Sequence, residues 1–310
     1  MDEVTAFAPA SVGNVGVGFD ILGQSVEAVG DRVTLRRSKV SGVRIERIAG
    51  IKESLPREPE KNTAGRALIA MQEALHLDFG FEVAIEKGIP LGSGLGGSAA
   101  SAVAAVVAAN ELLPQKLTRI ELLKFAMQGE EVASGSVHVD NIAPSLFGGL
   151  VLTVGIDNPR IKQIPVPADI RCVLVHPHMY LSTREARAIL KPSCALADVI
   201  WQTANLAGFI AGCYTNDLAM IRDSFEDVII EPQRQALIPG FQTVKSAARA
   251  AGALGCSISG AGPTIFAWCE SRDAVAVRDG MAQAFAAHGL ASDQWISATS
   301  LTGASIVECR

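Results

Sequence analysis

The feature of this sequence that most constrains its fold is a glycine-rich loop, PLGSGLGGSAAS, at residues 90–101. Residues 81–87 before it alternate apolar and polar side chains, which predicts a strand. The alanine-rich stretch from Ser98 to Leu113 predicts a helix. The first amides of a helix lack partners and lie at the positive end of the helix dipole. A strand, a Gly-rich loop and a helix in this order therefore predict an anion-binding site.

Three interpretations of this Gly-rich loop compete once a Walker A loop is excluded, since no Gly-Lys-Ser/Thr follows it. Gly92-x-Gly94-x-x-Gly97 matches the dinucleotide fingerprint, but that fold needs a second strand ending in an acidic residue about 20 positions later. A second helix is predicted there instead, from Arg119 to Val132. A tight turn without a ligand needs fewer glycines and serines. A phosphate cradle therefore fits best.

The rest of the chain mixes strand and helix patterns without internal repeats, which predicts an α+β protein. Capping boxes are predicted for Thr118 with Glu121 and for Ser182 with Glu185. We expect two domains, at residues 1–155 and 156–310. Strands are predicted at 4–8, 32–39, 43–48, 81–87, 148–154, 171–176, 254–259 and 264–269 and near Trp295 and Ser305, and helices at 63–77, 98–113, 119–132, 195–213 and 274–288, from Ser182, and before Gly252.

Composition limits the classes of partner. The 310 residues include 27 Lys and Arg against 32 Asp and Glu, and the net charge of −5 offers no general attraction to nucleic acid or to an anionic membrane. A phosphate site must therefore be built locally. No leader peptide or stretch of ~20 apolar residues is evident. The six cysteines form no C-x-x-C pair, so reduced thiols and a cytoplasmic location are expected.

Five segments, in order along nearly the whole chain, resemble the homoserine kinase family of the GHMP kinase superfamily. The Gly-rich loop is similar to P-x-x-x-G-L-G-S-S-A-A and departs from it only at Gly97, which replaces the first paired serine. The other four are PASVGNVGVGFD at 9–20, GEEVASGSVHVDNIAP at 129–144, EPQRQALIPGF at 231–241 and SISGAGPT at 257–264.

This resemblance implies a two-domain GHMP kinase fold, with a ribosomal-protein-like N-terminal domain and a ferredoxin-like C-terminal domain. It implies ATP-dependent phosphorylation of L-homoserine to O-phospho-L-homoserine in threonine biosynthesis. ATP and Mg²⁺ are then required, homoserine is the small-molecule partner, and a homodimer is a family expectation.

The resemblance also assigns roles to residues on the nucleotide side. Ser98 and Glu130 match the residues that hold Mg²⁺, a hard ion that prefers oxygen ligands. Asn62 matches an adenine-contacting position, although a helix cap explains it equally well. The residues expected to contact ATP are Asn62, Pro90, Leu91, Gly92, Ser93, Gly94, Leu95, Gly96, Gly97, Ser98, Ala99 and Ala100.

On the acceptor side, homoserine carries an ammonium and a carboxylate, and burying either without a partner is costly. Asp20 can pair with the ammonium, and Arg187 and Arg234 can grip the carboxylate through their guanidinium groups. All three match substrate-binding positions of the family.

Three more residues, Asn14, His138 and Asn141, also match substrate-binding positions of the family. Asn141 is expected near the transferring group, as a catalytic residue with Ser98 and Glu130. The general base stays open between Asp140, His138 and no base; we favour the base-free route, because the hydroxyl need lose its proton only late.

Two alternatives follow from the same motifs. A sister kinase could phosphorylate mevalonate, shikimate or a sugar, but those acceptors carry no ammonium for Asp20 to bind. A catalytically silent module could bind an amino acid on the same fold, but the presence of Ser98 and Glu130 argues against it.

Overall fold

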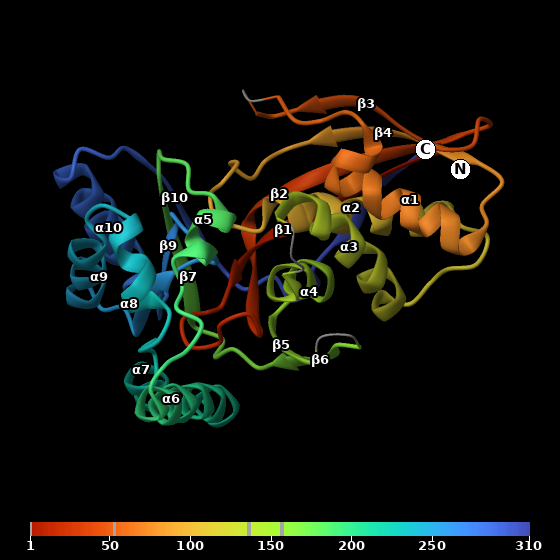
Figure 1. Cartoon of the computed structure of the whole chain (residues 1–310). Helices are drawn as coiled ribbons and strands as arrows, with labels where there is room; N and C mark the ends of the chain where they lie inside the picture. The colour runs from red at the N-terminus through yellow and green to blue at the C-terminus, as the bar shows by residue number, and fades with distance from the viewer. Residues whose placement is uncertain (1, 52–53, 135–137, 156–157) are drawn as a thin grey trace.

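The computed structural model of the chain describes residues 2–51, 54–134, 138–155 and 158–310. Two sheets lie end to end, each covered by helices on one face, and a central region joins them (Figure 1). This arrangement is an α+β fold, as the sequence predicts.

The larger sheet belongs to the N-terminal half and has the strand order β11-β1-β2-β4-β3, with β5 paired to β2 and β6 paired to β5. Only the β3–β4 pair is parallel among the pairings that the described residues make in this sheet. Its strands are β1 (Glu3–Gly13), β2 (Leu22–Ser38), β3 (Val43–Ala49), β4 (Gly80–Glu86), β5 (Leu150–Val154), β6 (Arg160–Ile164) and β11 (Ser305–Cys309).

Four helices cover this sheet, and the most deeply buried of them is the alanine-rich α2 (Figure 1). Its small side chains allow close packing on β1 and β2 on one side and on the other helices on the opposite side. A helix that is apolar all round is expected to be buried in this way. The helices are α1 (Thr63–Leu75), preceded by the 3-10 turn η1 (Pro59–Lys61), α2 (Gly97–Leu112), α3 (Arg119–Ser134) and α4 (Val139–Phe147).

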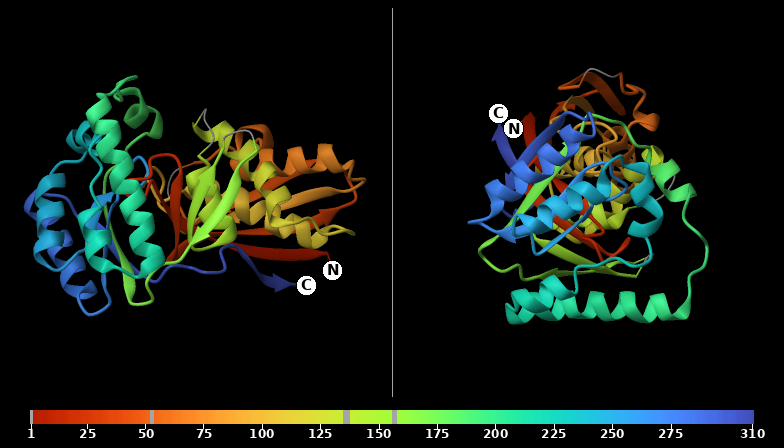
Figure 2. Two further views of the ribbon diagram at one scale, coloured as in Figure 1. Left: turned by 90° about the horizontal axis from the view of Figure 1, so that it is seen from below. Right: turned by 90° about the vertical axis from the view of Figure 1, so that its left-hand side faces the viewer.

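The smaller sheet has the antiparallel order β10-β7-β9-β8 and carries α9 and α10 on one face (Figures 1 and 2). The long helix α6 lies along the outside of this half. The elements are β7 (Ile170–Pro177), α5 (Thr183–Ala188), α6 (Leu196–Thr215), α7 (Leu218–Asp223), α8 (Glu231–Arg234), the 3-10 turn η2 (Gln235–Leu237), α9 (Phe241–Ala250), β8 (Gly255–Ile258), β9 (Ile265–Glu270), α10 (Ala274–Ala287) and β10 (Ser292–Ser297).

A buried aromatic cluster joins the two halves. Phe209 packs edge-on against Phe225 and tilted against Trp268, with ring centroids 5.2 Å apart in both cases. The Trp268 indole donates a hydrogen bond of 2.7 Å to the Gln24 side chain on β2, so its one polar atom is satisfied inside the core. Because this cluster is continuous with the core under the larger sheet, the halves are held in a fixed relation.

The predicted division at residues 155 and 156 does not coincide with the division between the sheets. Both β6 and β11 lie beyond residue 155 and still pair into the larger sheet. β6 joins the larger sheet because it forms a hairpin with β5, its neighbour in the sequence. β11 joins it through a long-range pairing with β1. Residues 156 and 157 lie outside the described part of the chain.

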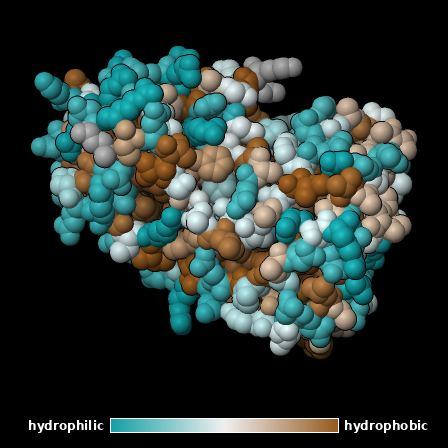
Figure 3. Space-filling view, turned by 180° about the vertical axis from the view of Figure 1, so that it is seen from behind, coloured by the Kyte–Doolittle hydropathy of each residue, from teal (hydrophilic) through white to brown (hydrophobic). Residues whose placement is uncertain are grey.

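The outer surface is mixed. Seen from behind, hydrophilic residues cover most of the perimeter and hydrophobic residues gather in groups across the middle (Figure 3). Among the helices of the described residues, none has the length and apolar character needed to cross a bilayer.

Candidate active site

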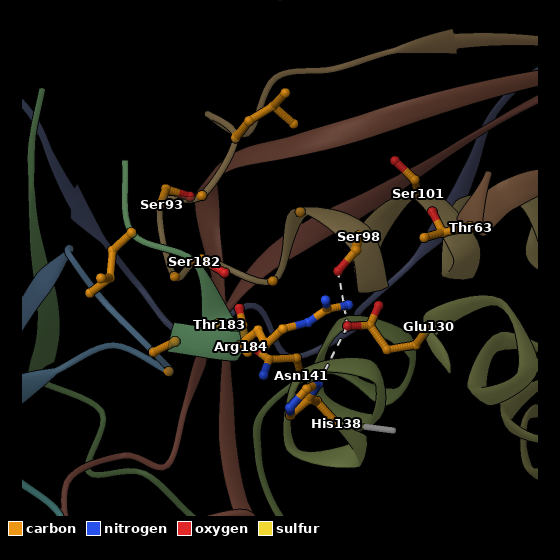
Figure 4. Close-up of a pocket in the computed structure, with 18 of the residues that line it drawn as sticks. Thr63, Ser93, Ser98, Ser101, Glu130, His138, Asn141, Ser182, Thr183 and Arg184 are labelled. Atoms are coloured by element: carbon orange, nitrogen blue, oxygen red, sulfur yellow. Dashed lines mark hydrogen bonds and ion pairs between the residues drawn. The ribbon is translucent and has the colours of Figure 1, made fainter. Parts of the chain in front are cut away.

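A cleft of 760 Å³ lies where the two halves meet, and Figure 4 shows many of its lining side chains. The N-terminal half contributes the Gly-rich loop and residues at the adjoining ends of α3 and α4. The C-terminal half contributes residues 180–185 with Arg187, Arg234 and the turn at Gly260. We call this space the central cleft.

The Gly-rich loop needs its glycines because its backbone is left-handed at three positions. Gly92, Gly94 and Gly96 have φ angles of 62°, 77° and 67°, which residues with a Cβ rarely adopt. A Cβ on Gly94 would also lie 2.4 Å from the Ser259 carbonyl oxygen. The Ser259 hydroxyl donates to the Gly94 carbonyl at 2.8 Å, so the loop is docked onto the 257–264 segment.

The loop leads directly into α2, whose N-cap is Gly96. No side chain in the described part of the chain caps this helix end, so the first amides are open to a ligand in the central cleft. Together with the positive end of the α2 dipole, these amides could hold an anion at the place where the sequence predicts an anion-binding site.

A buried charge network, which the sequence analysis did not identify, joins the end of the Gly-rich loop to the larger sheet. The Lys87 ammonium binds the Asp31 carboxylate and donates to the Gly97 carbonyl at 2.6 Å and to the Ser101 hydroxyl at 2.9 Å. The same Asp31 carboxylate accepts the backbone amide of Gly88 at 3.0 Å. Because each charge is paired and hydrogen-bonded, the network fixes the start of α2 relative to the sheet.

A signal for this network was present in the alternation of β4. Phe81, Val83 and Ile85 point inward and are buried, and Lys87 is the next residue with the same parity. A lysine at an inward position must have a buried partner, because burying an unpaired charge is costly. The parity of Lys87 in the strand therefore predicts a buried ion pair, which its position at the end of the strand alone does not.

The expected metal ligands lie together at the start of α2. The Ser98 hydroxyl donates to the Glu130 carboxylate at 2.9 Å, and Glu130 is 4% exposed (Figure 4). His138 Nδ1 lies 3.6 Å from the same Glu130 oxygen. Burial alone would lower the pKa of His138, but the hydrogen bond to Glu130 and the charges of Asp140 and Glu130 raise it. Hard oxygen donors beside an anion site fit Mg²⁺.

Asn141 and Asp140 face the loop from the first turn of α4. The Ser11 hydroxyl donates to the Asn141 side-chain oxygen at 3.0 Å, and the Asn14 amide donates to Asp140 Oδ2 at 3.2 Å. Asp140 is 2% exposed. Its burial, and next the charge of Asp20, raise its pKa to about 6.

Opposite charges meet at the other end of the central cleft. One Arg187 nitrogen donates to both carboxylate oxygens of Asp20, at 2.7 and 2.9 Å. Arg187 Nε is buried and has no hydrogen-bond partner among the described residues. Arg234, which is 3% exposed, donates to the carbonyls of Ala186 at 2.9 Å and Gly260 at 3.1 Å. Burial and the nearby Arg187 lower the pKa of Arg234.

All of the site residues predicted from the sequence line the central cleft except Leu95, Ala99 and Ala100. Those three are fully buried, so their side chains anchor the loop and the helix in the core. Asn62 lines the cleft and also caps α1, accepting the amides of Ala64 at 3.1 Å and Gly65 at 3.3 Å. Residues 135–137 of the 129–144 segment lie outside the described part of the chain.

The sequence analysis missed the side chains that the C-terminal half extends over the cleft just before Arg187. Tyr180, Ser182, Thr183 and Arg184 all line it. The available signal was the spacing of Thr183 and Arg184 from Arg187, because residues three and four positions apart lie on the same face of a helix.

Comparisons with known proteins agree with this arrangement. Residues 62–149 match the GHMP kinases N terminal domain and residues 209–287 match the GHMP kinases C terminal domain, one on each side of residue 155. The homoserine kinase of Xylella fastidiosa is 49% identical over 306 residues, covering 98% of this chain and 94% of its own length. That of Chloroherpeton thalassium is 42% identical over 319 residues, covering 99% of this chain and all of its own length.

A solved structure matches the whole fold. The crystal structure of homoserine kinase from Cytophaga hutchinsonii superposes with a TM-score of 0.96 at 44% identity, covering 99% of this chain and 98% of the other.

Proposed function

Because the chain belongs to the homoserine kinase family of the GHMP kinases, we propose that the central cleft is where it transfers the γ-phosphoryl group of ATP to the hydroxyl of L-homoserine. The product is O-phospho-L-homoserine. The observation that carries the proposal is the presence, in one cleft, of the helix end of α2 without a side-chain cap and of a paired set of opposite charges.

The nucleotide is proposed to lie along the Gly-rich loop. The uncapped amides of α2 would face its phosphates, and Asn62, which also lines the central cleft, would contact the adenine. Ser98 and Glu130 would hold Mg²⁺, which neutralises phosphate charge when bound. The chain itself prepares this place by bringing two oxygen ligands together on α2 and α3.

The acceptor is proposed to bind between Asp20, Arg187 and Arg234. Asp20 would take the ammonium of homoserine, and the guanidinium groups would take its carboxylate. The buried Nε of Arg187 supports this assignment, because a buried donor without a partner is costly unless a ligand satisfies it. Both arginines also lie over the Phe19 ring, at 5.4 and 5.1 Å from its centroid, which orients them toward the cleft.

We propose that transfer needs no dedicated base. Asn141 is held by Ser11 beside the loop, at a place where it can orient the reacting groups. Asp140 accepts the Asn14 amide and is almost fully buried, which suits a residue that holds the segment around Asn14 in place. The hydroxyl proton can leave late in a loose transition state.

We propose a cytoplasmic homodimer, with the outer face of α6 as the contact. Leu196, Ile200 and Trp201 are 75%, 63% and 57% exposed on this helix. Large apolar side chains gathered on one exposed helix are typical of a surface that pairs with another protein. Their replacement by charged residues should change the mass measured by light scattering.

The test of the function is the release of ADP from Mg-ATP in a coupled assay with homoserine, mevalonate and shikimate as separate acceptors. We expect turnover with homoserine alone. Turnover with only a non-amino acid would favour a sister kinase. Binding of homoserine by calorimetry without ADP release would favour a silent binding module.

A further inference from the structure

Among the described residues, five lysine and arginine side chains line the central cleft, and four of them are paired or hydrogen-bonded within the chain. Lys61 pairs with Glu58 at 3.5 Å, and Lys87 is locked beneath the Gly-rich loop by Asp31. The other two engaged cations are the arginines of the acceptor end, Arg187 and Arg234.

The side chain of the fifth cation, Arg184, forms no hydrogen bond or ion pair with residues 2–51, 54–134, 138–155 and 158–310. Its side chain is exposed and is therefore available to a ligand. Figure 4 shows it extending from α5 toward the Ser98–Glu130 pair.

The helix that carries Arg184 is held firmly in place. Arg234 donates to the Ala186 carbonyl of α5 at 2.9 Å, and Ala186 itself is fully buried. Just before α5, the Leu181 amide lies 3.5 Å from the Gly92 carbonyl, so this segment also touches the Gly-rich loop. Arg184 is therefore presented across the cleft from the half opposite the loop, on a short helix with defined supports.

The negative charge of bound Mg-ATP and of the cleft walls favours a further cation such as Arg184. ATP bound to one Mg²⁺ keeps a net charge of about −2, and the transferring group spreads its charge over three oxygens. Glu130, Asp140 and Asp20 add further negative charge to the walls. The α2 dipole supplies only about half a positive charge. Lys87 cannot swing out without leaving the buried Asp31 unpaired.

We propose that Arg184 contacts the β- and γ-phosphoryl oxygens of Mg-ATP and stabilises the charge on the transferring group, as a catalytic residue supplied by the C-terminal half. The inference rests on the proposed function. In the step it serves, the homoserine hydroxyl oxygen forms a bond to the γ-phosphorus. The bond from that phosphorus to the β,γ-bridging oxygen breaks, its electron pair stays on ADP, and the hydroxyl proton passes late to a phosphoryl oxygen.

The test compares the full-length chain with Arg184→Gln, Arg184→Lys and the control Arg222→Gln, which removes an exposed arginine of α7 that does not line the cleft. For Arg184→Gln we expect kcat to fall about 100-fold and the KM for Mg-ATP to rise several-fold, while the KM for homoserine stays within twofold. Arg184→Lys should recover about tenfold in kcat, because it keeps the charge and loses the planar fork. Arg222→Gln should match the unchanged chain.

Nucleotide affinity separates a phosphate contact from a structural role. By calorimetry, Arg184→Gln should bind Mg-ATP about tenfold more weakly and AMP equally well. Equal losses for both nucleotides, or a kcat and KM within twofold of the unchanged chain, would overturn the inference. If the unchanged chain fails to phosphorylate homoserine, the proposed function fails, and the Mg-ATP and AMP affinities still decide the role of Arg184.

Discussion

Replacing Asp140 by asparagine should remove a pH-dependent cost to the fold. Burial raises the pKa of Asp140 to about 6 from its ordinary value of 3.8, so between these two values the folded chain holds a proton that the unfolded chain has released. The group therefore stabilises the fold at low pH, and this contribution is lost as pH rises through about 6. Between pH 5 and pH 8, linkage with these two values gives a loss of about 1.4 kcal/mol in the free energy of unfolding.

The neighbouring His138 acts in the same direction. The charge of Asp140 helps to raise the pKa of His138, whose protonated form then favours the fold until pH rises through that raised value. Asp140→Asn removes the first effect and the part of the second that comes from the Asp140 charge, while Glu130 still raises the pKa of His138. An amide oxygen can still accept the backbone amide of Asn14. The free energy of unfolding of the variant minus that of the unchanged chain should therefore grow by at least ~1.4 kcal/mol from pH 5 to pH 8.

The assay is urea unfolding of both chains at pH 5, 6, 7 and 8 in one buffer system, followed by tryptophan fluorescence, with kcat measured at pH 8. We expect Asp140→Asn to keep kcat within about tenfold, because a lost general base costs 10²–10⁴-fold. A difference in stability that is flat across the pH series would refute the role given to burial. A loss of kcat beyond 100-fold would refute the base-free route.

Three further outcomes are expected. Ser98→Ala should lower kcat at least 100-fold with an unchanged circular dichroism spectrum, and higher Mg²⁺ should restore part of the activity, because one oxygen ligand is lost. Arg234→Leu should raise the KM for homoserine at least tenfold with little change in the KM for ATP; a larger effect on ATP would contradict the assignment of the acceptor end. Lys87→Met should cost about 3–5 kcal/mol in chemical unfolding by leaving the Asp31 charge buried and unpaired, and the double variant with Asp31→Asn should recover part of this loss.

The sequence predicted most of the regular elements because their patterns are local. Half of the Thr118–Glu121 capping box is confirmed, with the Thr118 amide donating to the Glu121 carboxylate at 2.7 Å. The Thr118 hydroxyl donates to the same carboxylate at 2.7 Å, whereas a full capping box would have it accept the Glu121 amide. The corresponding box at Ser182 is wrong, since Ser182 makes no side-chain cap bond and the segment faces the cleft instead. Capping patterns read from the sequence fail where the same side chains face a cleft formed by residues distant in the sequence.

Helix α4 shows a different limit. It is only nine residues long and contains Pro144, which argues against a helix on local grounds. Pro144 has no amide hydrogen to donate to the Asp140 carbonyl. This carbonyl packs against Gly23 on β2, where a Cβ would lie 1.7 Å from the carbonyl oxygen. Packing against β2 therefore stabilises a helix that the sequence alone does not predict.

The candidate site was predicted where the residues follow recognisable motifs, as with Ser98, Glu130 and the acceptor arginines. The Lys87 network and Arg184 were not predicted, because their importance depends on which other charges are already paired. That information is three-dimensional. Lys87 has a structural role because Asp31, which is distant from it in the sequence, pairs with it in the fold. Arg184 has no such partner among the described residues.

The pairing of β11 with β1 has a consequence for how the chain is made. Val4 aligns with Cys309, so β1 is synthesised long before the strand that covers its edge. The ends marked N and C lie close together in Figure 2. That edge of β1 stays open until β11 has been made, and an open edge invites contact with other nascent chains. Truncation after residue 304 would leave this edge of β1 open in the finished chain, although it removes no residue that lines the central cleft.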